Sequence, residues 1–295
     1  MRIAITGSHG LIGTALVDRL VEFGHDVVRI VRSSAGPDDI SWDPAADRLE
    51  ASDLIGVDAV VNLAGAGIGD HRWTDDYRRT ILESRTKSTT LLAEAIAAVD
   101  GGPGTMLSGS AIGFYGDRGD EELDETSGSG DGFLAEVARD WEASTTAARA
   151  QARVVHLRTG IVLAEGGALS KMLPLFKLGL GGRFGSGRQW MSWVSLTDEV
   201  GAIVHLLGSD VSGAVNLTAP QPVTNATFAD TLGEVLHRPT FLPVPSFGPK
   251  LVLGADRADA LLFGSQRVQP RVLEADGFAF AHPDLASALR AELDR

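Results

Sequence analysis

A glycine-rich turn near the start of the chain limits the available folds more than any other part of the sequence. The apolar run Ile3–Ile5 predicts a strand, and apolar positions from Leu11 to Phe23 recur with helical spacing. The residues between them follow the spacing G-x-x-G-x-x-G, at the junction of strand and helix. In such a turn the first glycine permits a tight bend, the second a close approach to a pyrophosphate, and the third close packing of helix on strand. Because free N–H groups at a helix start hold phosphates, the turn predicts dinucleotide binding by Thr6, Gly7, Gly10, Leu11, Ile12 and Gly13.

Short apolar runs then alternate with amphipathic stretches through the first half of the chain. Strands are predicted at 27–31, 58–62, 105–108, 153–158 and 215–218, and helices at about 74–99 and 131–150. Nearly all-apolar strands separated by helices indicate an α/β fold, a doubly wound parallel sheet covered on both faces. The pattern loosens after Ile161, where glycines and prolines become frequent. We therefore expect a dinucleotide-binding domain at 1–163, to which about 194–220 return, and a smaller substrate-side α/β domain at 164–193 and 221–295.

Composition excludes several classes of function. The 295 residues carry 26 Lys and Arg against 39 Asp and Glu, a formal net charge of −13. Such a chain is a poor partner for nucleic acid or an anionic membrane surface. It has no cysteine, which excludes disulfides and thiolate chemistry, and its seven histidines lack metal-ligand spacing, so no metal is expected. Without a secretory signal or an apolar span, we expect a cytoplasmic monomer or homodimer that binds a small molecule.

The end of the second predicted strand indicates which nicotinamide cofactor is bound. Sites for NAD usually place an acidic residue here to bond the ribose 2′-hydroxyl, whereas an arginine accommodates the 2′-phosphate of NADP. No Asp or Glu lies between Val27 and Ala35, and the strand runs into Arg32 and Ser33. These two residues are the predicted 2′-phosphate ligands, and NADP(H) is the predicted cofactor. An ordinary surface arginine is the alternative.

Several further motifs carry a resemblance to a known family. They are Asn62-Leu63-Ala64-Gly65, Ser84-Arg85, Ser110-Ala-Ile-Gly-Phe-Tyr-Gly116, Asp140-Trp-Glu142 and the run from Gly185 to Trp193. With the glycine turn, the chain resembles the extended short-chain dehydrogenase/reductase superfamily, and within it an atypical NAD(P)-dependent epimerase-like family with a small extra C-terminal domain. The resemblance covers essentially the whole chain and implies a Rossmann-type fold. It also implies that Leu63, Ala64, Gly65 and Ser84 lie beside the cofactor.

The resemblance breaks down at the catalytic residues. Superfamily members use a serine and a Y-x-x-x-K pair, in which the tyrosine serves as acid and base. The two tyrosines here, Tyr77 and Tyr115, have no lysine four residues later. Alignment to the family order puts Phe133 at the tyrosine place and Val137 at the lysine place.

Two catalytic candidates remain. Ser110 matches the superfamily serine, with a helix-capping role as the alternative, and Tyr115 is the nearest replacement acid, with plain packing as the alternative. Two functions therefore stay open. The first is an NADP(H)-dependent oxidoreductase or nucleotide-sugar-epimerase-like enzyme on a small substrate. The second is a catalytically silent NADP(H)-binding sensor or regulatory protein, as the cell-division-inhibitor label of some relatives suggests.

A glycine-rich basic segment follows in this acidic chain. Glycines crowd 179–187, and Arg183, Arg188 and Gln189 lie in or beside that stretch. Arginine suits bidentate contact with carboxylate or phosphate, so these three residues are predicted to bind an anionic substrate or effector. A flexible solvated loop is the alternative. Nearby Asp198 is predicted to cap a helix that begins at Glu199.

Overall fold

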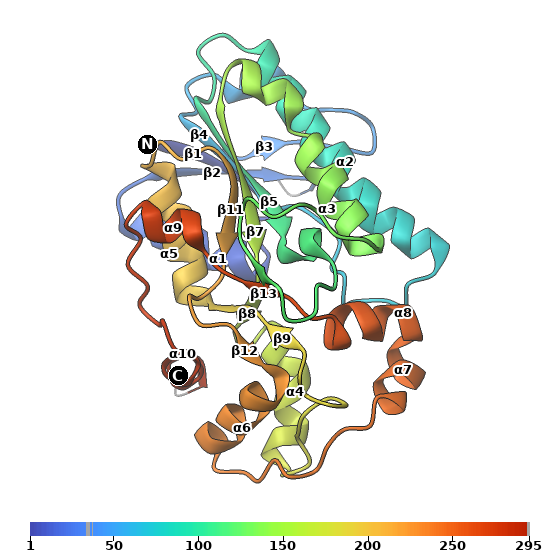
Figure 1. Ribbon diagram of the computed structural model, residues 1–295. Coiled ribbons are helices and arrows are strands. Elements are labelled where there is room, and N and C mark those ends of the chain that lie inside the picture. Colours follow the sequence, from blue (N-terminus) through green and yellow to red (C-terminus); the bar gives the residue numbers. More distant parts are fainter. Residues whose placement is uncertain (34–35, 37, 294–295) are drawn as a thin grey trace. The chain divides into compact units, whose positions relative to one another are not determined.

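The computed structural model describes residues 1–33, 36 and 38–293 of the chain; the last two residues of the predicted C-terminal domain, 294 and 295, lie outside this range (Figure 1). Contacts divide the chain into two compact units. The first unit contains Met1–Ala111, Glu136–Arg158 and Val200–Val215. The second contains Ile112–Ala135, Thr159–Glu199 and Asn216–Arg295.

A seven-stranded sheet runs through the first unit in the order β11-β7-β5-β4-β1-β2-β3. Its strands are β1 (Arg2–Thr6), β2 (Asp26–Val31), β3 (Ile40–Ser41), β4 (Ala59–Asn62), β5 (Thr105–Ala111), β7 (Arg153–Thr159) and β11 (Gly213–Leu217). β1 pairs in parallel with β2 and β4, β2 with β3, and β4 with β5. The predicted doubly wound α/β fold is confirmed.

Helices cover this sheet because alternate strand residues point to opposite faces. The helices are α1 (Leu11–Glu22), η1 (Ala51–Leu54), α2 (Asp75–Ala98), α3 (Phe133–Ala143), η3 (Thr146–Ala150) and α5 (Leu196–Leu207). On one face, Val60 and Met106 pack with Leu92 and Ile96 of α2 in one buried cluster. Figure 1 shows α2 and α3 side by side. The long α2 is therefore held by an apolar stripe, as its spacing predicts.

The helix predicted over 131–150 is wrong in its second half. α3 ends at Ala143, and a separate 3₁₀ helix, η3, follows at 146–150. The hydroxyls of Ser144, Thr145 and Thr146 each donate to a main-chain carbonyl three or four residues earlier. Such side-chain bonds compete with the helical pattern. Three hydroxyl residues in a row therefore end α3.

The second unit is built from short elements. They are η2 (Ile112–Tyr115), β6 (Glu122–Leu123), β8 (Ile161–Leu163), α4 (Ala168–Lys177), β9 (Trp190–Met191), β10 (Trp193–Ser195), β12 (Val223–Thr224), α6 (Asn225–Leu236), α7 (Phe247–Leu253), α8 (Ala255–Ala258), the π-helix η4 (Asp259–Phe263), β13 (Arg267–Val268), α9 (Arg271–Ala275) and α10 (Leu285–Leu293). Its core gathers apolar side chains of α4, α6 and α10, such as Leu173, Phe228 and Leu289, with Trp193 of β10. The strands pair only in twos, as β10 with β8, β12 with β9, and β13 with β6. Helix packing therefore provides most of the core of this unit.

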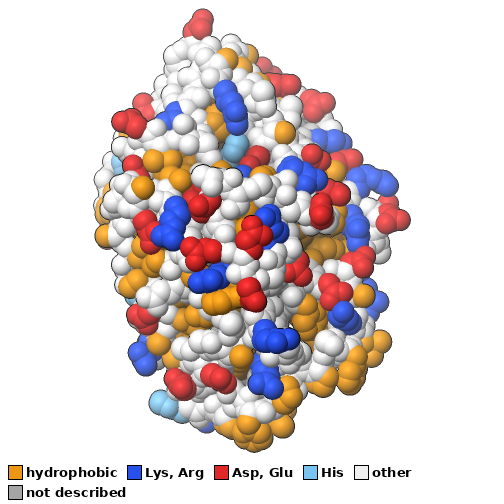
Figure 2. All heavy atoms as spheres, viewed as in Figure 1, with side chains coloured by type: hydrophobic (Ala, Val, Ile, Leu, Met, Phe, Trp, Pro, Cys, Tyr) orange, Lys and Arg blue, Asp and Glu red, His pale blue; other side chains and the backbone are white. Residues whose placement is uncertain are grey.

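The short helix α7 buries none of its side chains. Phe247, Leu251 and Val252 are each more than 60% exposed, and hydrophobic side chains gather at the surface around this helix (Figure 2). Within residues 1–33, 36 and 38–293, no helix combines the length and apolar character needed to cross a membrane.

Candidate functional site

The order of the strands defines where the first unit binds a ligand. From β1 the chain crosses through α1 to β2 on one side, and it later returns to β4 on the other side of β1. The strand order therefore reverses between β1 and β4. In open α/β sheets, ligands bind in the crevice outside the carboxyl ends of the strands at such a reversal. Those ends are Thr6 and Asn62, which are register partners.

The glycine turn between β1 and α1 lies at this crevice. Gly7 has φ +68°, and a Cβ placed on it would lie 2.7 Å from the carbonyl carbon of Leu63. A Cβ on Gly13 would lie 2.2 Å from the carbonyl oxygen of Gly7. Gly10, the exposed N-cap of α1, has an ordinary φ of −78°, and its nearest contact would be 3.2 Å. The protein's own packing therefore requires glycine at 7 and 13, whereas at 10 it leaves the helix start open to a ligand.

Hydrogen bonds tie the turn to the end of β4. The buried hydroxyl of Thr6 donates to the amide oxygen of Asn62 at 2.7 Å and accepts from the main-chain N–H groups of Leu63 and Ala64. Asn62 in turn donates to Thr89 of α2 at 2.8 Å. Both turns at the crevice are therefore held in one rigid arrangement before any ligand arrives.

Arg32 and Ser33 follow directly after β2, on the β2 side of the same crevice. Thr6 at the end of β1 is paired with Ile30, so Arg32 lies two residues beyond that pair. Both side chains are exposed, and within the described part of the chain the Arg32 guanidinium forms no ion pair. Their binding of a 2′-phosphate stays a prediction.

Ser84 and Arg85 of α2 hold the segment that follows β4. The Ser84 hydroxyl accepts from the N–H of Ala66 at 3.0 Å, and Arg85 donates to the Ala66 carbonyl at 3.0 Å. Gly65, exposed, lies against the Arg85 guanidinium. The predicted group Leu63, Ala64, Gly65 and Ser84 thus gathers beside the glycine turn.

Ser110 lies near the end of β5, and its hydroxyl donates to Glu142 of α3 at 2.7 Å. Arg158 of β7 holds the same carboxylate with two bonds of 2.8 and 2.9 Å. Burial alone would raise the pKa of Glu142, but the bonds and charge of Arg158, with the bond from Ser110, hold it below its usual value. Burial also lowers the pKa of His156, whose Nδ1 lies 3.6 Å from Glu142. Glu142 is therefore an ionised anchor for Ser110.

Tyr115 belongs to the second unit, in η2. Its side chain is fully buried, and its hydroxyl donates to the amide oxygen of Asn216 at 2.8 Å. On α3, Val137 at the lysine place is buried and Phe133 at the tyrosine place is partly buried. This geometry supports the packing alternative for Tyr115, and its role in proton transfer stays a prediction.

The three residues predicted to bind an anion differ in their surroundings. Arg183 and Arg188 are exposed, and within the described residues neither guanidinium forms an ion pair. Gln189 is buried, and its amide donates to the carbonyls of Phe184 and Leu262, so its donors are used within the protein. A surface hollow contains both Arg188 and Gln189; its other lining residues are Asp117, Gly119, Asp120, Ser186, Phe263 and Ser265. The two aspartates bring negative charge beside Arg188.

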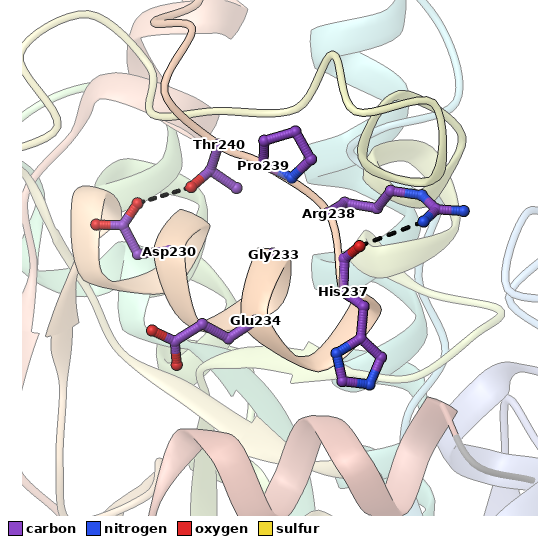
Figure 3. A pocket seen from close by; sticks show the side chains of 7 residues that line it. All are labelled: Asp230, Gly233, Glu234, His237, Arg238, Pro239 and Thr240. Carbon is purple, nitrogen blue, oxygen red and sulfur yellow. Dashed lines mark hydrogen bonds between the residues drawn. The ribbon is translucent and has the colours of Figure 1, made fainter.

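Another hollow lies at the end of α6, lined by Asp230, Gly233, Glu234, His237, Arg238, Pro239 and Thr240 (Figure 3). None of these residues was predicted to bind a ligand. Asp230 accepts a bond from Thr240 at 2.9 Å, and Arg238 donates to the carbonyl of Lys177. These polar groups already bond within the protein, and the hollow adds no candidate chemistry.

The role predicted for Asp198 is wrong. α5 begins at Leu196, and the hydroxyl of Ser195 accepts from the N–H of Asp198 at 2.9 Å. Ser195 is therefore the capping residue. The Asp198 carboxylate lies inside the first turn and accepts from the N–H groups of Ala281 and His282. These two hydrogen bonds hold the segment before α10 in place.

Three residues at the first unit's site were not predicted: Arg85, Glu142 and Arg158. The motifs Ser84-Arg85 and Asp140-Trp-Glu142 marked two of them, but the residues alone gave them no role. Arg158 had no signal, because its importance arises only when β7 comes beside α3. Among the described residues, no three histidines or acids cluster as metal ligands would.

Comparisons with known proteins show the family of this chain. The model of the NAD dependent epimerase/dehydratase family matches residues 3–218, and a domain of unknown function (DUF1731) matches residues 244–292. Epimerase family protein MT2273 of Mycobacterium tuberculosis is 44% identical over 291 residues, which cover 97% of this chain and 96% of that protein.

Two solved structures are also similar. The crystal structure of human epimerase family protein SDR39U1 (isoform 2) with NADPH has a TM-score of 0.93 and 38% identity, and covers 100% of both chains. A nucleoside-diphosphate sugar epimerase from Corynebacterium glutamicum has a TM-score of 0.80 and 38% identity over 99% of this chain and 58% of its own. The family match spans more than half of the chain, and the relatives extend it over nearly all of the rest. This chain belongs to the NAD dependent epimerase/dehydratase family.

Proposed function

We propose that this protein binds NADP(H) in the crevice between β1 and β4 and uses it as an oxidoreductase or nucleotide-sugar-epimerase-like enzyme. The glycine turn carries the proposal, because Gly10 leaves the start of α1 open where a diphosphate would bind. The human relative of known structure was solved with NADPH, which supports the same cofactor here.

The preference for NADP(H) over NAD(H) rests on the end of β2. Arg32 and Ser33 are exposed there, and no acidic side chain lies between Val27 and Ala35. A guanidinium is suited to a phosphate, whereas an acidic residue would repel it. Arg32 and Ser33 therefore bind the 2′-phosphate of the adenosine.

Bound NADP(H) would supply or accept a hydride. The chain's own contribution is Ser110, whose hydroxyl donates its one hydrogen bond to Glu142. A serine hydroxyl has one donor and two acceptor lone pairs, so Ser110 keeps only its lone pairs for a ligand. It therefore accepts a hydrogen bond from a substrate hydroxyl more readily than it donates to a carbonyl.

The substrate is small and anionic in this proposal. Arg183 and Arg188 support it, because both are exposed cations without an ion-pair partner among the described residues. The acids Asp117 and Asp120 beside Arg188 weaken that attraction, which makes Arg183 the stronger contact.

A catalytically silent NADP(H)-binding protein is the second candidate. One observation favours it: both candidate hydroxyls, of Ser110 and Tyr115, are buried and donate to side chains of the protein. With Phe133 and Val137 at the places of the usual acid and its lysine, no exposed proton donor replaces them at those positions.

Cofactor titration tests the proposal. NADPH and NADH are titrated into the protein and followed by nicotinamide fluorescence, with Arg32→Ala beside the matched control Arg19→Ala on α1. We expect NADPH to bind more tightly than NADH, and Arg32→Ala to weaken NADPH alone by about 10- to 100-fold. Equal affinities for both cofactors would overturn the assignment. Two turnover assays separate enzyme from sensor. NADPH oxidation is followed with carbonyl compounds, whereas epimer formation, which consumes no net cofactor, is followed with nucleotide sugars and NADP⁺. Tight cofactor binding without turnover in either assay favours the sensor.

A further inference from the structure

Arg85 is fixed against the turn that follows β4. Its Nη1 donates to the carbonyls of Ala66 and Ile81, each at 3.0 Å. A Cβ placed on Gly65 would lie 3.1 Å from the guanidinium carbon. A glycine at 65 therefore lets the cation lie directly beside the exposed main chain of this turn.

The Arg85 guanidinium also stacks on an aromatic ring. It lies over the ring of Trp141 of α3, 5.0 Å from the ring centroid. The ring is itself fixed, because its Nε1 donates to Thr89 at 3.0 Å and it packs on Gly109, where a Cβ would lie 2.7 Å from a ring carbon. A stacked guanidinium held by two carbonyls has little freedom left.

The charge of Arg85 has no acidic partner within the part of the chain that the structure describes. Burial lowers the pKa of Arg85 to about 10, which still leaves it charged at neutral pH. Both of the hydrogen bonds that it forms with described residues start at Nη1, so Nε and Nη2 are left for a ligand. A partly buried cation without a counter-charge is costly, and an anionic ligand would offset that cost.

The position of Arg85 indicates which part of the ligand it meets. Arg32 and Ser33 lie on the β2 side of the crevice and bind the adenosine half in the proposed function. Arg85 lies on the β4 side. We propose that Arg85 binds the nicotinamide half of NADP(H), through the phosphate and ribose oxygens next to the nicotinamide. This inference rests on the proposed function.

Fragment binding tests it. The compound 2′,5′-ADP carries the adenosine and its 2′-phosphate but lacks the nicotinamide half. Calorimetry is used to compare NADPH and 2′,5′-ADP on the intact chain, on Arg85→Gln, and on the control Arg79→Gln, an exposed arginine of the same helix. Arg85→Gln is expected to weaken NADPH about 10- to 100-fold and to leave 2′,5′-ADP unchanged. Arg79→Gln should change neither.

The outcomes separate this inference from the proposed function. If the intact chain does not bind NADPH, both fail. If the intact chain binds NADPH and Arg85→Gln binds NADPH equally well, only the role of Arg85 is overturned. The role of Arg85 is also overturned if a folded Arg85→Gln variant binds NADPH and 2′,5′-ADP more weakly by the same factor. Should Arg85→Gln not fold, as judged by circular dichroism, Arg85→Lys decides. Lysine offers one nitrogen in place of three, so NADPH should bind several-fold more weakly with 2′,5′-ADP unchanged. Unchanged NADPH affinity in Arg85→Lys overturns the inference.

Discussion

The hydroxyl of Tyr115 donates a 2.8 Å hydrogen bond to the amide oxygen of Asn216, and both side chains are fully buried. Asn216 is fixed in turn, since its amide donates to the carbonyl of Gln269 and its N–H to Glu125. This pair joins η2 to the end of β11 within the second unit. A hydroxyl so placed has its proton committed to the protein.

Tyr115→Phe should therefore destabilise the protein. The substitution keeps the ring but leaves the buried amide oxygen of Asn216 without its donor, which costs about 1–3 kcal/mol. Urea denaturation measures the loss, with Tyr77→Phe as the matched control. The Tyr77 hydroxyl donates to the carbonyl of Gly67 from a partly buried position, where water can replace it, so its loss should be smaller.

Turnover of the same variant separates packing from catalysis. If Tyr115 is the proton donor, Tyr115→Phe lowers the rate by at least ~100-fold in protein that is still folded. A near wild-type rate with reduced stability would assign Tyr115 to packing alone.

The glycines of the first turn should respond differently to alanine. At Gly13 a Cβ would lie 2.2 Å from the carbonyl oxygen of Gly7, so Gly13→Ala should lower both the melting temperature and NADPH affinity. At Gly10 the nearest contact is 3.2 Å, to the carbonyl oxygen of Gly7, and φ is ordinary, so Gly10→Ala should cost much less stability than Gly13→Ala. It should nevertheless bind NADPH at least about 10-fold more weakly, because the methyl group would occupy the approach of the diphosphate. Wild-type affinity in Gly10→Ala would place the phosphates elsewhere.

Glu142→Gln should be strongly destabilising. Arg158 is buried, and its Nε and Nη2 both donate to this carboxylate, so the amide would remove the negative charge that these two bonds meet. Removing one partner of such a pair costs about 3–5 kcal/mol. Glu136→Gln, on the exposed side of the same helix, is the control and should change stability little. A small effect of Glu142→Gln in urea denaturation would mean that water replaces the carboxylate as a hydrogen-bond partner of Arg158.

The same cluster should make the protein sensitive to acid. The pKa of Glu142 and that of His156 are both held below their usual values in the folded protein. Stability from such groups is fully present above their unfolded pKa values, about 6.5 for histidine and 4.3 for glutamate. It is lost as the pH falls through the folded values. We therefore expect the unfolding free energy, measured by urea denaturation at a series of pH values, to decline below about pH 6.5.

The sequence predicted what depends on neighbours along the chain. Gly7 has φ +68° and Gly13 lies against the main chain of the turn itself, and a local spacing rule captures both. The alternation of apolar strands and amphipathic helices likewise predicted the parallel sheet. These features need no knowledge of distant residues.

The rest depends on contacts between residues far apart in the chain. Tyr115 and Asn216 are 101 residues apart, and no pattern in the sequence around either residue predicts their hydrogen bond. Gln189 was predicted to bind an anion because of its basic neighbours. Its amide instead donates a hydrogen bond to the carbonyl of Leu262, 73 residues away. In the second unit, strands of two or three residues have too little periodicity to be recognised.

Glu199 should make the protein sensitive to alkali, in the opposite sense to Glu142. Its side chain is fully buried, and its one hydrogen bond among the described residues comes from Thr159 at 2.7 Å. Burial raises the pKa of Glu199 to about 8, although the bond from Thr159 acts in the opposite direction. A raised folded pKa contributes stability that is fully present below the unfolded value of about 4.3 and is lost as the pH rises to about 8.

Glu199→Gln is the test of this slope. Glutamine matches the shape of the protonated acid and can still accept the bond from Thr159, but it has no proton to lose. The unfolding free energy of Glu199→Gln, measured by urea denaturation from pH 5 to 9, should therefore fall less with rising pH than that of the wild type, and the variant should be the more stable at pH 9. Glu234→Gln, exposed on α6, should follow the wild-type curve. Parallel curves for Glu199→Gln and the wild type would show that Glu199 does not titrate in this range, and hence that its carboxyl is charged and paired in solution.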